Sequence, residues 1–279
     1  MATKVPAFTY SGTSRSEVKD GYWYIYLKSS GTIKFSYAKT LEACIVGGGA
    51  AGQGRSAATT GVRTYGGGGG TVLNKTGISV SAGTGYSIVI GSGGTRGLSS
   101  TDGSASKAFG YSAAGGSTEA QVGTDEGKNG TYAFGDRTLS RYGGGGGRGG
   151  DSPGGGGFSG GAGGGGYGAD GGSYGGRGAD AIAGEANTGG GGGGYGSDLH
   201  WDGNFAAGGD NADGGSGVVI LRGTQDDLLP VKFNGVQIAK MTFNGENVTG
   251  LIYDGTRIFA EALRRMRQSL AGRMSAYGV

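Results

Sequence analysis

Runs of consecutive glycine constrain the fold of this chain more than any other feature. Between residues 141 and 216, 36 of 76 residues are glycine. The longest runs, at 143–147 and 189–194, are separated by single Tyr, Phe, Arg, Ser or Asp residues. Glycine has no side chain to pack, and it loses more backbone entropy on folding than any other residue. The composition therefore predicts either a flexible linker or a structure held together by its backbone alone.

We favour a backbone-bonded structure, because polyglycine has a regular form that requires glycine. It can adopt the polyproline II-type helix, which has three residues per turn, a rise of about 3.1 Å per residue and no internal hydrogen bonds. Every N–H and C=O then points outward and needs a partner. Because Cβ atoms are absent, such helices can pack side by side and bond to one another. The sequence predicts a polyglycine II bundle over 93–216, with isolated Tyr and Arg residues at its edges.

Apolar residues gather towards the two ends of the chain, where short β-strands are expected. Segments rich in aromatic and β-branched residues, each bounded by Gly, Ser or Asn, lie at 22–27, 31–36, 42–46, 71–73, 77–80 and 86–90. Their spacing predicts a jelly-roll-like β-sandwich over 1–92. A further strand at 217–222 follows the glycine region, so we expect 217–223 to complete the sheet that the chain leaves near Gly91.

Residues 224–279 form a third predicted unit, with a ten-residue repeat of an aromatic residue followed by Asn-Gly or Asp-Gly. These dipeptides tolerate the positive φ angles of tight hairpin turns, so small hairpins are expected. A short amphipathic helix should follow them. We predict a docking or oligomerisation module, because so small a unit buries little apolar surface alone. The residues expected to dock are Phe259, Leu263, Met266 and Leu270, with Arg264, Arg265 and Arg267 beside them.

The sequence contains little that indicates catalysis. Its only histidine is His200, and its only cysteine, Cys44, lies in an apolar run. No Cys/His spacing typical of zinc is present. We therefore predict no catalytic, cofactor-binding or metal-binding residues, and a protein that is not an enzyme. A glycan-cleaving enzyme stays open as an alternative, because paired carboxylates cannot be identified from spacing in such loops.

Calcium is the one ion that the sequence brings into question. The pattern GGxGxD occurs at 165–170, 175–180 and 193–198. A calcium β-roll needs tandem nine-residue units, and these copies are 10 and 18 residues apart. We interpret them as chance matches in a glycine-rich chain and predict no cofactor, with calcium as the alternative.

Charge and hydropathy exclude two classes of partner. Residues 141–216 contain three arginines, no lysine and eight acidic residues, a net charge of −5. Nucleic-acid binding depends on positive charge and counterion release, so this region should repel nucleic acid. No stretch approaches the roughly 20 apolar residues of a membrane span. The first residues lack the features of a signal peptide, so we expect synthesis in the cytoplasm and, if the protein leaves the cell, release without the general secretory signal.

The strand–glycine junctions at 46–49, 65–72, 87–94 and 215–220 resemble those of the glycine-rich domain of phage and prophage tail proteins. The resemblance covers roughly residues 20–223. The glycine block is also similar to the polyglycine II sandwich of tip adhesins of T-even-like phages. That resemblance implies that loops at the ends of the bundle touch the bacterial receptor. The Asn-Gly repeats resemble small modules of phage fibres and baseplates.

These features together predict a bacteriophage tail-tip or tail-fibre protein, located in the virion, that attaches to the host cell as a receptor-binding adhesin. Its expected partners are a bacterial surface glycan or protein and, through residues 224–279, other tail proteins. A homo-oligomer would be a trimer. A purely structural baseplate or tail component is the alternative. The aromatic residues expected to be exposed and to contact the receptor are Tyr167, Tyr174, Tyr195, Trp201 and Phe205.

Overall fold

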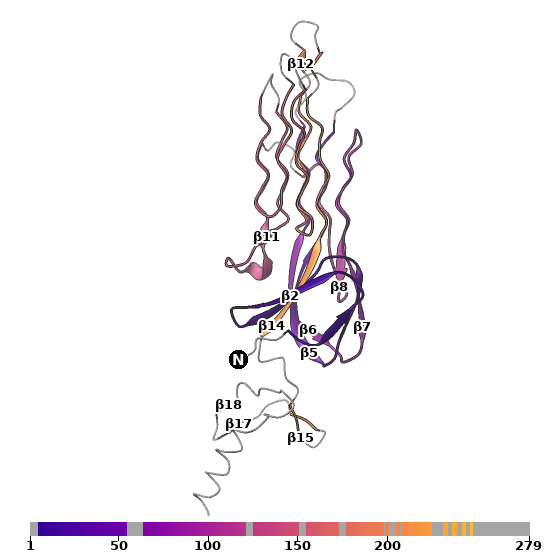
Figure 1. Cartoon of the computed structure of the whole chain (residues 1–279), viewed down its shortest axis with the longest axis vertical. Helices are drawn as coiled ribbons and strands as arrows, with labels where there is room; N and C mark the ends of the chain where they lie inside the picture. Colours follow the sequence, from indigo (N-terminus) through magenta and orange to yellow (C-terminus); the bar gives the residue numbers. More distant parts are fainter. Residues whose placement is uncertain are drawn as a thin grey trace, which may run out of the picture. The chain divides into compact units, whose positions relative to one another are not determined.

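The computed structural model describes residues 5–54, 64–120, 125–150, 155–172, 177–197 and 208–224 in full, and six short strands at 199–200, 205–206, 231–233, 236–238, 242–243 and 246–247 as backbone (Figure 1). The chain divides into two compact units, Val5–Gly223 and Thr224–Val279 with Met1–Lys4. The described residues form β-strands and one short 3-10 helix, which confirms the predicted all-β fold. The predicted C-terminal helix lies outside the described residues.

Two five-stranded sheets form the base of the larger unit. The first sheet has the order β1-β4-β7-β8-β9, and the second has the order β2-β3-β14-β5-β6. The strands of the first sheet are β1 (Phe8–Tyr10), β4 (Gly31–Phe35), β7 (Gly85–Val89), β8 (Ser106–Ala108) and β9 (Tyr111–Ala113). Those of the second are β2 (Ser14–Lys19), β3 (Tyr22–Leu27), β5 (Lys39–Val46), β6 (Val72–Val80) and β14 (Val218–Thr224). The strand pairs of the two sheets whose residue-by-residue register is described are all antiparallel, as in a β-sandwich.

The strand that returns from the glycine region joins a different sheet from the one predicted. The chain leaves from β7 in the first sheet, but β14 lies in the second sheet between β3 and β5. Val218 pairs with Val46, and the pairing runs to Arg222 opposite Glu42. β14 therefore completes the sheet that the chain leaves after Val46, where the first glycine run begins.

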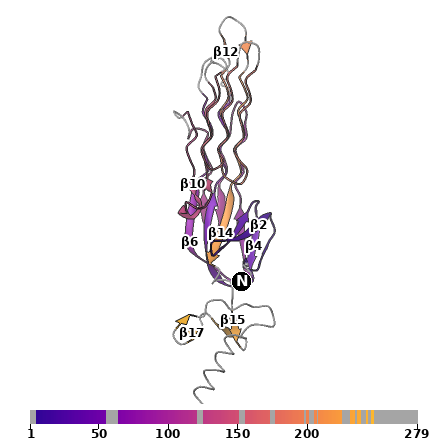
Figure 2. The ribbon, with the colours of Figure 1, turned by 60° about the vertical axis from the view of Figure 1, so that its left-hand side comes forward.

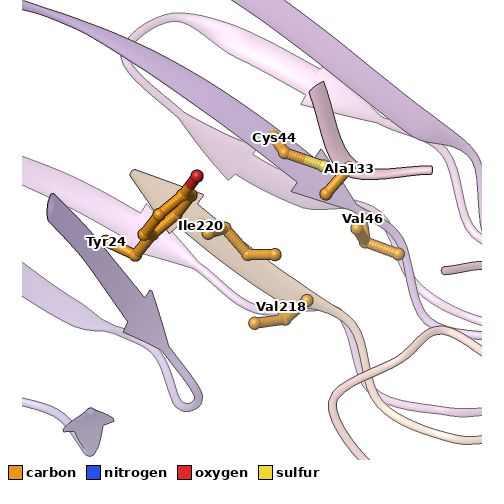
Figure 3. Packing of buried hydrophobic residues seen from close by; sticks show 6 residues of the cluster. All are labelled: Tyr24, Cys44, Val46, Ala133, Val218 and Ile220. Carbon is orange, nitrogen blue, oxygen red and sulfur yellow. The ribbon is translucent and has the colours of Figure 1, made fainter. Parts of the chain in front are cut away.

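Strand β5 of the second sheet is buried on both of its faces. Leu41, Ala43 and Ile45 alternate along β5 with Cys44 and Val46, and all five are at most 2% exposed. Burial of both faces explains why the last four residues of β5, at 43–46, are all apolar instead of alternating with polar residues. On the face with Cys44, the packing cluster of the second sheet contains Tyr24, Val46, Ala133, Val218 and Ile220 (Figure 3).

A short segment covers the face of the second sheet that carries Cys44. It consists of β10 (Thr131–Tyr132), the 3-10 helix η1 (Ala133–Gly135) and β11 (Arg141–Tyr142). The Arg222 guanidinium lies between the rings of Tyr22 and Phe134, 4.9 and 4.1 Å from their centroids, and pairs with Glu42 at 2.5 Å. The stacked cation fixes η1 against the sheet.

The glycine-rich segments run side by side away from the two sheets (Figures 1 and 2). In segment 47–53, every third N–H donates to the same neighbouring segment. The N–H groups of Gly47, Ala50 and Gln53 donate to the carbonyls of Thr71, Gly68 and Tyr65 in one segment. Those of Gly48 and Ala51 donate to Ser104 and Thr101 in a second segment, and those of Gly49 and Gly52 donate to Gly215 and Ala212 in a third. Successive donors thus point to three different neighbours, which is the periodicity of a helix with three residues per turn.

Three more segments donate to the carbonyls of segment 47–53, through Gly116, Gly94 and Gly192. One segment is therefore bonded to six others, whereas a strand in a flat sheet has two neighbours. Glycine leaves room for this contact, since a Cβ atom at most of these positions would collide with a neighbouring carbonyl oxygen. The threefold repeat and the six neighbours are the hydrogen-bond pattern expected for polyglycine II packing, in which backbone hydrogen bonds form the core.

The bundle extends beyond the predicted 93–216. Segments 47–54 and 64–71, which the sequence assigned to the sandwich, form part of it, and the inner segments 47–52, 144–150 and 189–197 are buried. Residues 106–113, assigned to the bundle, instead form β8 and β9 of the first sheet. The insertion is therefore interleaved with the sandwich.

The smaller unit contains two described hairpins. β15 (Val231–Phe233) pairs with β16 (Val236–Ile238), and β17 (Thr242–Phe243) pairs with β18 (Glu246–Asn247). The connecting residues are Asn-Gly in both, at the positions expected for tight hairpin turns. The part of the ten-residue repeat from Leu251 onward, where one more hairpin is expected, lies outside the described residues.

Candidate functional site

The end of the bundle away from the sheets, called here the distal end, brings together segments that are remote in sequence. Neighbouring segments are still bonded close to their last described residues. These bonds join Tyr195 to Gln53, Ser197 to Gly150, Gly172 to Ser197, and Gly171 to Gly155. The hairpin of β12 (Leu199–His200) and β13 (Phe205–Ala206) lies at the same end (Figure 1). A rigid backbone core thus supports a surface built from several connections.

The distal end is stepped, because one pair of segments is shorter than the others (Figures 1 and 2). Segments 91–94 and 101–104 are joined by a turn that lies beside Gly52, whose carbonyl accepts from Ser100 Oγ at 2.6 Å and from Asn211 Nδ2 at 2.7 Å. Segment 189–197 continues past this level. The step contains a pocket, called here the shoulder pocket, whose walls are Arg96, Gly97, Leu98, Arg177, Tyr195, Gly208, Asp210 and Asn211.

Ion pairs and a buried amide shape the shoulder pocket. Arg177 Nη2 lies 2.6 Å from Asp180 Oδ1 and 2.7 Å from Asp210 Oδ2. The Asp210 N–H also donates to Asp180 Oδ1 at 2.8 Å. Asn211 is only 5% exposed and donates from Nδ2 to Ser100 Oγ at 2.9 Å. These bonds tie three segments of the wall together.

Two of the predicted receptor-contact residues have described surroundings, and they differ. Tyr167 is 41% exposed on an outer segment of the bundle, as predicted. Tyr195 is 7% exposed, so the prediction that it is exposed was wrong. Its N–H donates to Gln53 inside the bundle, and its position in the threefold repeat directs the residue inward. Tyr195 nevertheless lines the shoulder pocket.

The remaining predicted contact residues are less defined. Phe205 is the partner of His200 in the distal hairpin, where only the backbone is described. Tyr174 and Trp201 lie outside the described residues. The same holds for all seven docking residues, Phe259, Leu263, Met266, Leu270, Arg264, Arg265 and Arg267. The sequence did not single out Arg96, Arg177 or Asp210. These residues are brought together by the pairing of glycine segments, and runs of glycine carry no side-chain pattern from which that pairing could be predicted.

One thiol and two phenol groups in or near the sandwich keep their protons because burial raises their pKa values. Burial raises the pKa of the Cys44 thiol to about 12, and burial raises that of Tyr142 to about 12. Burial and the bond to Glu17 also raise the pKa of Tyr26. These groups remain neutral near pH 7, and Cys44 is 0% exposed, so this cluster offers no activated nucleophile.

The carboxylates of the GGxGxD segments are engaged within the protein where they are described. Asp170 Oδ1 accepts from the Gly157 N–H at 2.9 Å, and Asp180 binds Arg177. Asp198 lies outside the described residues. Over the described part of the chain, no three His, Cys, Asp or Glu side chains gather as a metal ion would require.

The sequence matches no known protein-family model and has no significant match among curated proteins. In the described ranges, no helix has the length and apolar character needed to cross a bilayer.

Proposed function

We propose that this protein is a bacteriophage tail-tip or tail-fibre protein that attaches the virion to the host cell, with the distal end of its glycine bundle as the receptor-binding surface. The observation that supports this role is the bundle itself. Its buried segments are bonded on all sides by backbone, so they can hold several connections at one end without a hydrophobic core. Variable loops on a rigid scaffold are the usual arrangement in recognition proteins.

The distal end supports binding better than catalysis. Rigid aromatic and ion-paired side chains give contact area at low entropic cost. The pocket with Arg177 and Asp210 has groups of this kind, and the exposed Tyr167 lies on an outer segment part-way along the same bundle. In the smaller unit, two short hairpins suit docking onto other tail proteins, because hairpins of that size are marginal alone. An oligomer, a trimer if one forms, would be assembled through that unit.

Binding of the fluorescently labelled full-length chain to a panel of bacterial strains tests the proposal. We expect saturable binding to some strains and competition with adsorption of the phage that carries the chain. A variant whose distal hairpin Leu199–Ala206 is replaced by a short Gly-Ser linker should lose binding. The matched control replaces the exposed turn Asp20-Gly21 of the β2–β3 hairpin, which belongs to the base of the unit.

The other roles predict different results. A purely structural tail component would bind no strain, while remaining visible in the particle by electron microscopy. A glycan-cleaving enzyme would release reducing sugars from the strains that it binds. Equal cell binding by both turn variants would place the receptor surface elsewhere and contradict the proposal.

A further inference from the structure

We propose that the shoulder pocket binds a neutral saccharide unit, such as a hexose ring of a surface glycan. This inference deepens the adhesin role and rests on it for its biological setting, because it assigns a ligand class to one part of the distal surface. It is carried by the arrangement of hydrogen-bonding groups, by their charge balance and by their rigidity.

The pocket offers donors and acceptors side by side. Both ion pairs of Arg177 use Nη2, and no described residue accepts a hydrogen bond from its Nε or Nη1. Asp210 contacts Arg177 through Oδ2, and its side chain is 55% exposed. Sugar hydroxyls donate and accept at once, and planar guanidinium and carboxylate groups can meet two neighbouring hydroxyls. A simple anion would use the donors and be repelled by the carboxylate.

The charge around the pocket favours a neutral ligand. Among the described residues around the pocket, Arg96 and Arg177 supply two positive charges, and Asp180 and Asp210 balance them. Asp213, which accepts from the Arg96 N–H at 2.6 Å, adds a further negative charge. A phosphate or an acidic sugar would therefore enter a site with a net negative charge, and like charges disfavour that binding.

The pocket also combines a fixed polar floor with an apolar rim. Asn211 is held by Gly52 and Ser100, so its wall does not have to become ordered on binding. Leu98 is 73% exposed at the rim, and Tyr195 lines the wall. A pyranose ring has a C–H face that packs against apolar side chains and an edge of hydroxyls for the polar groups.

Saturation-transfer difference NMR on the full-length chain tests this inference. The probes are methyl glycosides of glucose, galactose, mannose, rhamnose and N-acetylglucosamine, with sialic acid as the anionic probe. We expect at least one neutral glycoside to bind with a Kd on the order of 1–10 mM, as is typical of a small ligand in an open pocket. Its binding should change little with salt concentration, because no net charge is exchanged.

Two variants locate the binding. Arg177→Met should weaken it about tenfold or more, which corresponds to the loss of one or two charge-assisted hydrogen bonds. Leu98→Asp is an independent variant at a side chain that is 73% exposed and outside the ion pairs, and it should also weaken binding because it removes the apolar contact to the sugar ring. Arg15→Met, at an ion-paired arginine on the base with a 65% exposed side chain, is the matched control and should bind like the parent chain.

The inference is overturned if no neutral glycoside binds at about 50 mM, if only sialic acid binds, or if Leu98→Asp and Arg177→Met bind sugar as the parent does. Cell binding separates this result from the proposed function. A parent chain that binds cells but no neutral sugar would leave the adhesin role intact. A chain that binds sugar through this pocket but binds no cells would contradict the adhesin role and support the assignment of the pocket as a saccharide site.

Discussion

The N–H of Gly49 donates to the carbonyl oxygen of Gly215 at 2.8 Å, joining the first glycine run of the chain to the last residues before β14. A Cβ atom at Gly49 would lie only 2.1 Å from the carbonyl oxygen of Gly190, which belongs to a different segment. One residue thus has a bonding partner on one side and a steric neighbour on another. The absence of a side chain is what permits both contacts.

The first prediction concerns the sign of glycine-to-alanine changes in the bundle. At Gly192 a Cβ would collide with the carbonyl oxygens of Ala212 and Asp213, so Gly192→Ala should destabilise the fold by about 1–3 kcal/mol. At Gly156 the nearest atoms are 3.7 Å away, at Asp170 Oδ1. Gly156→Ala should therefore stabilise by about 0.4–1 kcal/mol, because alanine restricts the unfolded chain. The measurement is the free energy of unfolding of both variants in urea. Equal changes at Gly192 and Gly156 would contradict close packing of the segments.

Hydrogen exchange gives the second prediction. Amides of the buried segment 189–197 are bonded within the bundle, so they should exchange roughly a thousandfold more slowly than in a free peptide, an opening free energy of about 4 kcal/mol. The protection should approach that of β5, and amides of the exposed turn at Leu98 should exchange quickly. Free-peptide rates across 189–197, measured by NMR or mass spectrometry, would show that the glycine tracts are not bonded in solution.

The strands were predictable from sequence to the extent that side chains encode them. The predicted strand at 22–27 coincides with β3, and the β-branched run after the glycine region becomes β14. Two predicted strands at 71–73 and 77–80 form one strand, β6, because the pairing with β5 shifts register around Gly77, whose φ is 70°, and resumes at Ile78.

The glycine segments could be predicted as a class but not in their order. Identical runs of glycine carry no side-chain pattern that distinguishes one neighbour from another, so the pairing of Gly49 with Gly215 cannot be read from sequence. For the same reason, the inward position of Tyr195 and the outward position of Tyr167 were not distinguishable. The shoulder pocket depends on that pairing, so it could not be predicted from the sequence either.

A third prediction concerns the arginine inside the bundle. The Arg148 side chain is 3% exposed, its Nε lies 2.6 Å from Asp125 Oδ1, and its guanidinium stacks 4.3 Å from the centre of the Phe158 ring. Asp125→Ala would leave a buried cation without this carboxylate and should cost about 2–3 kcal/mol, a value reduced from fully buried pairs because Asp125 is 53% exposed. Arg148→Met should cost less, about 1–2 kcal/mol, because the freed Asp125 is hydrated.

The order of these two effects is the test. Urea unfolding followed by tryptophan fluorescence reports the base through Trp23, which is fully buried. Arg15→Met, at an exposed ion pair, should change stability by less than about 0.5 kcal/mol and serves as the control. Arg148→Met proving more damaging than Asp125→Ala would mean that the stacked guanidinium, and not its charge balance, fixes this segment.

The fourth prediction is a loss of stability in alkali that depends on Cys44. Burial raises the pKa of its thiol from 9.0 to about 12, so the folded state holds the proton more tightly than the unfolded state. The thiol's contribution is therefore fully present below pH 9 and is lost as the pH rises from 9 to about 12. Tyr142, with a pKa raised from 10.0 to about 12, adds a similar loss above pH 10. Cys44→Val should remove the part that begins at pH 9 and leave the later part.

Thiol reactivity checks the same burial by a separate route. At pH 8 the native chain should react with a disulfide reagent far more slowly than the chain unfolded in urea, because Cys44 is 0% exposed and protonated. Stability curves for parent and Cys44→Val, measured from pH 7 to 11, should diverge only above pH 9 once their constant difference is removed. Parallel curves across that range, or rapid labelling of the native thiol, would show that the cluster around Tyr24 and Val218 opens readily to solvent.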